Sequence, residues 1–184
     1  MDDKALVEAC IDGDYSAQKK LYQLYAPQMM GICMRYSSCV ADAEDILQDG
    51  FIKVYHHLNS YTGQGALGGW MRRIMINIAL QRYRESKNVQ FLHVEDTDLH
   101  LREVSEDVLS RMAADELMAI LQRLPIGFRT VFNLYAIEGF KHHEIASKLG
   151  ISEGTSKSQY SRSKAILREM IEKENIISER AISK

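Results

Sequence analysis

Side chains suited to binding chemistry fall into three groups, and the first is an acidic helix. Apolar residues at Ile46, Phe51 and Val54 predict a helix over residues 40–58 with one buried face. Its opposite face begins with four acids: Asp42, Glu44, Asp45 and Asp49. Early acids suit the positive N-terminus of a helix and would also fit a basic partner surface. The alternative is that they form an ordinary solvated face.

The second group joins a glycine-rich loop, residues 60–69, to a basic and aromatic helix, residues 70–87. Four glycines in ten residues will not hold a helix, so the first part is predicted to be a loop. Tyr61 and Trp70 beside several arginines suit single-stranded DNA, because unstacked bases rest on aromatic or guanidinium planes. Taken alone, the composition favours a simpler interpretation, with Trp70 in the core and the arginines in a solvated face.

The third group is a helix-turn-helix pattern in residues 142–168. His142–Leu149 predicts two helical turns, Gly150 permits a tight turn, and Ser152 suits the N-cap of a second helix running through Arg168. In this motif the second helix enters the major groove. Its side chains suited to phosphates are Lys157, Arg162, Lys164 and Arg168, and those that could reach base edges are Ser158 and Gln159. Helix–glycine–helix hairpins also occur in all-α proteins that do not bind DNA.

One face of this second helix is predicted to pack inward. Ser156, Tyr160, Ser163 and Leu167 share that face by their spacing. Two of the four side chains are hydroxyls, which are costly to bury without hydrogen-bond partners. We therefore expect each serine to have a partner within the domain.

Catalytic and metal chemistry are not predicted. The sequence has no phosphate-binding P-loop and no nucleophile elbow. The pairs His56–His57 and His142–His143 are adjacent, whereas ligands on one helix normally stand four residues apart. We expect neither a cofactor nor a metal site. The cysteines lack metal-ligand spacing and are expected to be free thiols: Cys10, Cys33 and Cys39.

Composition bounds the class of protein. The net charge is −2 and the pI is about 6.3, which argue weakly against a general nucleic-acid binder, but the bases are locally clustered. No run of about 18 apolar residues occurs, so membrane insertion is not expected. The N-terminal residues lack the basic start and apolar stretch of a secretory signal. We expect a cytoplasmic protein.

Helices must position these groups, because no stretch alternates with the strand period. Residues 4–25 predict helices broken near 12–14, and residues 27–37 predict a separate short helix. A further helix is expected at 126–138, with Gly139 as its stop, and a frayed tail at 172–184. The predicted fold is all-α. It has two small helical domains, 1–88 and 112–184, joined by a flexible acidic linker, 89–111; the second is a tri- or tetra-helical helix-turn-helix domain.

Three segments resemble the extracytoplasmic-function (ECF) sigma factors of bacterial RNA polymerase and occur in that family's order. Residues 43–55, AEDILQDGFIKVY, look like the family's core-polymerase-binding helix. Residues 70–80, WMRRIMINIAL, look like its minus-ten-element helix. Residues 124–168 resemble its minus-thirty-five-element domain, most closely at 145–155, IASKLGISEGT. Together the three segments cover most of the chain.

The resemblance implies a transcription initiation factor that binds core RNA polymerase and directs it to promoter DNA. It implies core-polymerase contacts at Asp45, Gln48, Asp49 and Phe51. It implies minus-ten contacts with the melted strand at Tyr61, Trp70, Arg73, Asn77 and Arg82. It implies minus-thirty-five contacts at Thr155, Lys157, Ser158, Gln159, Arg162 and Lys164. It further implies an anti-sigma factor, which in this family is often membrane-bound.

The sequence departs from the family pattern at some of these positions. Gln81 stands where the family commonly has Asp, which puts a local helix contact in doubt. Gln159 replaces a frequent Arg, and because Gln pairs well with adenine edges this favours adenine readout. Two alternatives to the sigma factor remain. One is a conventional helix-turn-helix regulator that acts without polymerase, and the other is an all-α interaction scaffold without DNA dependence.

Overall fold

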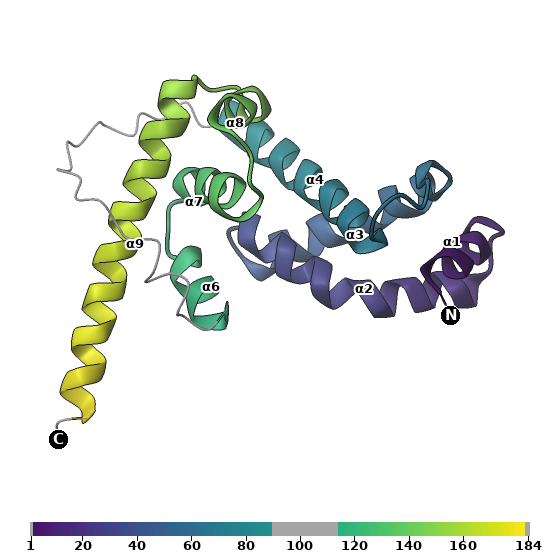
Figure 1. The fold of residues 1–184 in the computed structure, drawn as a ribbon, viewed down its shortest axis with the longest axis horizontal. Coiled ribbons are helices and arrows are strands. Elements are labelled where there is room, and N and C mark those ends of the chain that lie inside the picture. Colours follow the sequence, from purple (N-terminus) through teal and green to yellow (C-terminus); the bar gives the residue numbers. More distant parts are fainter. Residues whose placement is uncertain (1, 90–113, 183–184) are drawn as a thin grey trace. The chain divides into compact units, whose positions relative to one another are not determined.

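The computed structural model describes residues 2–89 and 114–182, and the part of the chain that it describes contains helices and no strands. The chain divides into two compact units, Met1–Val89 and Gln90–Lys184 (Figure 1). The all-α prediction with two helical domains is confirmed. The predicted linker lies, apart from residue 89, outside the described residues. We keep 1–88 and 112–184 as proposed domain boundaries.

Unit 1 contains α1 (Asp3–Ile11), α2 (Tyr15–Tyr36), α3 (Val40–His57), the 3-10 turn η1 (Leu58–Ser60) and α4 (Leu67–Val89). The predicted break between the first two helices is confirmed. Asp14 caps α2, because its carboxylate accepts a 2.8 Å hydrogen bond from the Ser16 backbone N–H.

The separate helix predicted at 27–37 is wrong, because α2 runs unbroken through Pro27. A proline inside a helix removes one backbone hydrogen bond and crowds the preceding turn. Here Pro27 is exposed, so water can reach the freed carbonyl, while Leu21, Met29 and Cys33 on the same helix are completely buried. Burial of that apolar face outweighs the local preference for a break.

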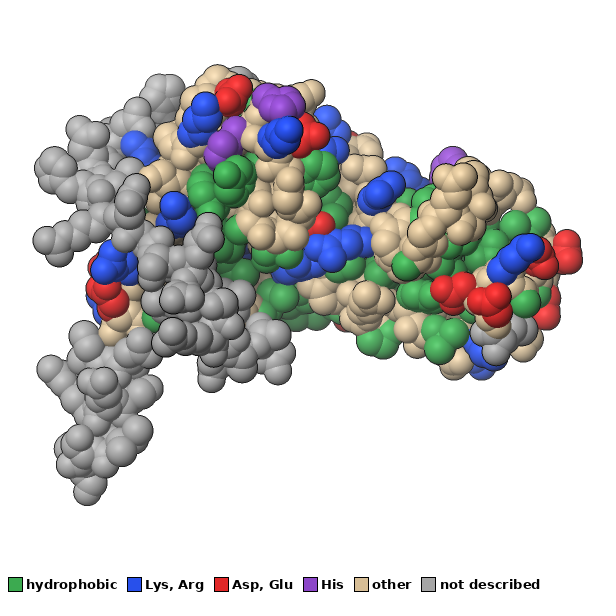
Figure 2. Space-filling model, viewed as in Figure 1, with side chains coloured by type: hydrophobic (Ala, Val, Ile, Leu, Met, Phe, Trp, Pro, Cys, Tyr) green, Lys and Arg blue, Asp and Glu red, His purple; other side chains and the backbone are tan. Residues whose placement is uncertain are grey.

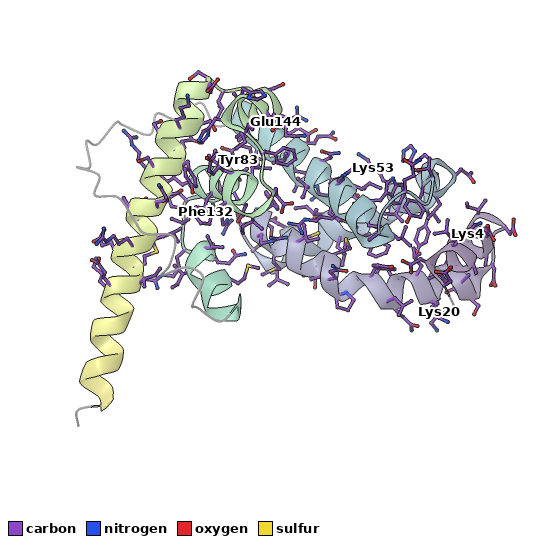
Figure 3. The ribbon with its side chains drawn as sticks, viewed as in Figure 1. Lys4, Lys20, Lys53, Tyr83, Phe132 and Glu144 are labelled. Carbon is purple, nitrogen blue, oxygen red and sulfur yellow. The ribbon has the colours of Figure 1, made fainter. Side chains whose placement is uncertain are left out.

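The core of unit 1 lies where α2, α3 and α4 pack against one another. Met71 and Met75 of α4 are completely buried there, and Tyr83 on the same helix is 7% exposed (Figure 3). Gly50 of α3 meets Met75 so closely that a Cβ at position 50 would lie 2.0 Å from the Met75 sulfur. A side chain at position 50 would therefore force the buried Met75 side chain to shift.

Unit 2 contains α6 (Ala114–Gln122), α7 (Ile126–Phe132), a π-helical turn η2 (Asn133–Ile137), α8 (His142–Leu149) and α9 (Glu153–Ile182). Gly139 and Gly150 follow helical segments with φ of +77° and +65°, so both predicted stops are confirmed. The core brings α6, α7 and α9 together through six buried apolar residues: Ile120, Leu121, Leu124, Phe132, Leu167 and Ile171.

The second helix of the motif is longer than predicted, because α9 continues past Arg168 to Ile182. The prediction of a frayed tail over residues 172–184 is therefore wrong as far as Ile182. Two ion pairs at four-residue spacing support the extension, one between Arg168 and Glu172 and the other between Glu169 and Lys173, each 2.7 Å long.

Arg129 is a buried structural residue that the sequence pattern did not reveal. It is 2% exposed on α7, and its guanidinium donates to the backbone carbonyl of Gln122 at 3.0 Å and to that residue's side-chain oxygen at 2.7 Å. These bonds satisfy a carbonyl at the end of α6 and fix the corner between α6 and α7. Burial lowers the pKa of Arg129.

Candidate nucleic-acid interface

The acidic face of α3 is exposed, as its sequence predicted. The side chains of Asp45 and Asp49 are 65% and 48% exposed, and Gln48 between them is exposed as well. Phe51 is different, because it is only 3% exposed and its ring lies 4.6 Å from that of Tyr22 on α2. Phe51 therefore fastens α3 to α2, and its side chain does not reach the surface where a partner would bind.

Acidic residues are not confined to α3. Figure 2 shows them gathered also at the end of unit 1 that α1 forms. The exposed members near that end are Asp2, Glu8, Asp12 and Asp14. Exposed acidity alone therefore does not single out α3 as a contact surface.

Arg82 of α4 pairs with two of the predicted polymerase contacts. Its guanidinium lies 2.5 Å from a carboxylate oxygen of Asp49 and 3.5 Å from one of Asp45. The hydrogen bond with Asp49 is the main reason that the pKa of Arg82 is raised. The structure thus brings together residues that the sequence pattern had assigned to two different partners.

The predicted single-strand site has a preformed aromatic pair. The rings of Tyr61 and Trp70 lie 5.6 Å apart, and both side chains are partly exposed. The Tyr61 hydroxyl donates a 2.6 Å hydrogen bond to the backbone carbonyl of Gly65, which ties the ring to its own loop. Farther along α4, Arg73 and Asn77 are exposed. Trp70 is thus neither wholly in the core nor wholly free, and its ring can still offer a face to a base.

Tyr25 lies between α1 and the start of α4, an arrangement that the sequence did not reveal. Its hydroxyl donates a 2.9 Å hydrogen bond to Asp3 of α1. A Cβ at Gly68 would lie 3.3 Å from the Tyr25 ring, so the start of α4 passes close to it. Burial, and then the bond to Asp3, raise the pKa of Tyr25 to about 12.

The helix-turn-helix pattern has the local geometry that its sequence predicts. The Ser152 hydroxyl accepts a 2.9 Å hydrogen bond from the Thr155 backbone N–H, which makes Ser152 the cap of α9. At the start of the preceding helix, Glu144 accepts a 2.7 Å bond from the Lys141 backbone N–H (Figure 3). The starts of α8 and α9 are therefore both capped, and the Ser152 cap fixes α9 where it leaves the turn.

The predicted DNA contacts on α9 differ in their freedom. Lys157 is exposed but forms a 2.8 Å ion pair with Glu153, and the Lys164 ammonium lies 4.9 Å from the centre of the Tyr160 ring. Thr155, Arg162 and Lys164 are partly buried, and the exposed Ser158 hydroxyl donates to the Thr155 carbonyl at 3.0 Å. The Gln159 amide oxygen is buried without a hydrogen-bond partner among the described residues. In this conformation Gln159 does not present the two-sided amide edge that adenine readout needs.

The inward face of α9 confirms the prediction about buried hydroxyls. Ser156 and Ser163 are both fully buried. The Ser163 hydroxyl donates to the Tyr160 carbonyl at 2.7 Å, and the Ser156 hydroxyl lies 3.0 Å from Nδ1 of His142 on α8. The His142 ring stacks on Tyr135 with centroids 4.3 Å apart and planes 13° apart. His142 therefore links α8 to the first turn of α9, a role its position in a histidine pair did not indicate.

Within residues 2–89 and 114–182, no group of three or more His, Cys, Asp or Glu side chains is placed to hold a metal ion. Over the same residues, no helix combines the length and apolar character needed to cross a membrane. The free thiols divide into two kinds: Cys10 and Cys33 are buried, and Cys39 is exposed. Burial raises the pKa of Cys33 to about 12.

The described residues of unit 2 form a capped helix-turn-helix with lysines along its second helix, an arrangement typical of DNA-binding transcription factors. Residues 21–89 match the family model described as Sigma-70 region 2, and residues 114–167 match Sigma-70, region 4. These matches fall on unit 1 and unit 2 respectively.

Individual relatives agree with the family models. The chain is 32% identical to the ECF RNA polymerase sigma-E factor of Haemophilus influenzae, covering 92% of this chain and 93% of the relative. It is 30% identical to the RNA polymerase sigma-H factor of Pseudomonas aeruginosa, covering 88% and 90%. A co-crystal structure of the sigma factor RpoE with the anti-sigma factor NepR from Bartonella quintana is similar with a TM-score of 0.47 and 23% identity, covering 84% of this chain and 96% of that one.

The chain belongs to the ECF group of RNA polymerase sigma factors. It is a transcription initiation factor that directs RNA polymerase to promoters. The alternative of a regulator that acts without polymerase is not favoured.

Proposed function

We propose that the two units divide promoter recognition between them, and that α3 attaches the chain to core RNA polymerase. The observation that carries the proposal is the placement of the two sigma-70 matches on two separate units, each with an exposed polar face. On α3 the contact residues are Asp45, Gln48 and Asp49. Phe51 is left out, because its buried ring holds α3 in place instead.

In unit 1, the melted strand of the minus-ten element would lie along the loop 61–66 and α4. Tyr61 and Trp70 would offer aromatic faces to unstacked bases, and Arg73 and Asn77 would meet phosphates and base edges. Extruding a base costs a few kcal/mol, so a pocket has to compensate for lost stacking. The tied Tyr61 ring supports this, because a preformed surface loses little entropy when a base docks.

In unit 2, α9 would enter the major groove of the minus-thirty-five element. Lys157, Arg162 and Lys164 would contact phosphates, while Thr155 and Ser158 lie near the start of the helix, where base edges are closest. Gln159 would contribute to readout only after its amide turns outward, since its oxygen is buried.

The partners that follow are core RNA polymerase, promoter DNA and an anti-sigma factor. The solved RpoE relative is in a complex with the anti-sigma factor NepR, and for the present chain such a partner is expected from its family. Because bacterial transcription takes place in the cytoplasm, we expect the chain to act there.

A binding measurement tests the assignment of α3. The double variant Asp45→Asn/Asp49→Asn removes two exposed charges with little change in shape, and Asp12→Asn removes an exposed charge on the α1 side of the unit. With labelled full-length chain and core RNA polymerase, we expect the double variant to bind at least about tenfold more weakly, as expected for the loss of two charged interface contacts. The Asp12→Asn control should bind normally. Equal affinities for all three proteins would rule out this face.

A further inference from the structure

Arg82 lies on the side of α4 that packs against α3. Met71, Met75 and Ile78 occupy that side at helical spacing and are at most 4% exposed. Arg82 follows four residues after Ile78, so it continues the same face at its solvent edge. Its aliphatic stem can cover apolar surface while its charged end stays in water. The side chain is 37% exposed, in keeping with that arrangement.

The predicted single-strand contacts occupy a different side of α4. Arg73 is about two and a half helical turns before Arg82, which places the two side chains on opposite faces. Arg73 and Asn77 are both exposed. Gln81, next to Arg82, is occupied by a 2.9 Å hydrogen bond to Glu85 within the same helix. A strand that follows Arg73 and Asn77 along α4 would therefore not pass the Arg82 guanidinium.

The guanidinium instead sits between two carboxylates of α3. Asp45 and Asp49 are one helical turn apart, and like charges at that spacing repel each other. Arg82 bridges them, at 3.5 Å and 2.5 Å, and reduces the net negative charge of the face on which they lie. Both carboxylates remain about half exposed or more, so a cationic group of a partner can still approach them.

We propose that Arg82 is a residue of the polymerase-facing surface, where it competes for Asp45 and Asp49 and so weakens docking on core RNA polymerase, and that it is not a minus-ten DNA contact. This inference rests on the proposed function of α3. The competition is modest, because exposed ion pairs contribute at most about 1 kcal/mol, which corresponds to roughly two- to fivefold in affinity. Because of this competition, the chain binds polymerase more weakly than it would if Asp45 and Asp49 were unpaired.

The test compares Arg82→Gln with Arg84→Gln. Arg84 is exposed on the same helix, and among the described residues no carboxylate of α3 binds it, so the control removes the same charge without touching the α3 face. Full-length proteins are titrated with core RNA polymerase at several salt concentrations, and the resulting holoenzymes are titrated with single-stranded minus-ten DNA. Arg82→Gln should bind core polymerase about two- to fivefold more tightly, with a steeper salt dependence. Arg84→Gln should do neither, and Arg82→Lys, which keeps the charge, should fall between wild type and Arg82→Gln.

Two further arms make the outcome decisive. In the Asp45→Asn/Asp49→Asn background, the effect of Arg82→Gln on core binding should vanish. In the DNA titration, the holoenzyme with Arg82→Gln alone should bind minus-ten DNA with wild-type affinity, whereas the holoenzyme with Arg73→Gln should bind it more weakly. Unchanged or weaker core binding by Arg82→Gln would overturn the inference, as would an equal gain from Arg84→Gln or a DNA loss like that of Arg73→Gln. Failure of the carboxylate double variant to weaken core binding would instead reject the proposed role of α3. Thermal unfolding of each variant confirms that it is folded.

Discussion

His142 is a single side chain on which the geometry of unit 2 depends. Its ring stacks on Tyr135 of the π-helical turn and meets the buried Ser156 hydroxyl of α9. Burial is the main reason that its pKa lies below the ordinary 6.5; Lys157 lowers it further, and Glu153 opposes this effect. The neutral ring is therefore the form that the folded unit favours.

A pH dependence of stability follows. Because the folded-state pKa is lower than the unfolded one, the unfolded chain takes up the proton first as the pH falls below about 6.5. The stability contributed by neutral His142 is present above that pH and is lost as the pH falls through the folded-state pKa. Thermal unfolding followed by circular dichroism between about pH 7.5 and pH 5 should show a smaller fall in midpoint for His142→Gln than for wild type. Replacing the exposed His56 with Gln should leave the wild-type slope; a wild-type slope in His142→Gln would refute this role.

Replacing Trp70 should separate binding of melted DNA from binding of duplex DNA. Its ring is partly exposed beside Tyr61, and stacking of a base on an aromatic ring is worth about 1–3 kcal/mol. In holoenzyme, Trp70→Ala should weaken binding to a promoter with a single-stranded minus-ten element by roughly fivefold or more, and binding to minus-thirty-five duplex much less. Trp70→Phe should retain most of the affinity. Equal losses on both DNAs would mean that Trp70 acts only as a core residue.

At the scale of elements, two glycines inside helices should respond in opposite ways to alanine. A Cβ at Gly31 of α2 would meet no side chain or neighbouring element within 4 Å, so Gly31→Ala should stabilise unit 1 by about 0.5–1 kcal/mol. A Cβ at Gly50 would lie 2.0 Å from the buried Met75 sulfur, so Gly50→Ala should cost about 1–3 kcal/mol through overpacking. Fluorescence of Trp70, the single tryptophan, reports denaturant unfolding of unit 1. Stabilisation by both substitutions would contradict the close approach of α3 and α4.

The proposed duplex contacts of α9 can be tested by removing single charges from the helix. Lys164 lies over the Tyr160 ring on the part of the helix that follows the turn, whereas Lys173 lies farther along and pairs with Glu169. Lys164→Gln should weaken duplex binding irrespective of sequence and reduce the slope of log affinity against log salt by about 0.9. Lys173→Gln should leave the slope unchanged. A wild-type slope in Lys164→Gln would remove this residue from the phosphate contacts.

Many of the helices, turns and caps could be predicted from the sequence, and the predictions that were wrong have physical causes. The turn at Gly150, the cap at Ser152 and the inward serines follow from local rules of backbone freedom, capping and helical periodicity. The break predicted at Pro27 was wrong because burial of the apolar face of α2 outweighed the local preference of proline for a helix end. The pairing of Arg82 with Asp45 and Asp49 could not be foreseen, since it depends on how α3 and α4 pack across residues distant in sequence.

At the scale of the whole molecule, the proposed function assigns melted DNA and the polymerase to unit 1 and duplex DNA to unit 2. No single motif established this function. The helix-turn-helix alone fits many regulators, and the acidic helix alone fits any solvated surface. Their order along one chain, with the sigma-70 matches at residues 21–89 and 114–167, is what defines the family.

The most direct test of this division of labour is transcription from fragmented genomic DNA of the source bacterium by its core RNA polymerase, with and without the purified chain, followed by sequencing of transcript start sites. With the chain present, we predict a limited set of new starts, each preceded by two sequence elements at a nearly constant separation. Identical, scattered start sites with and without the chain would contradict its role in directing polymerase to promoters.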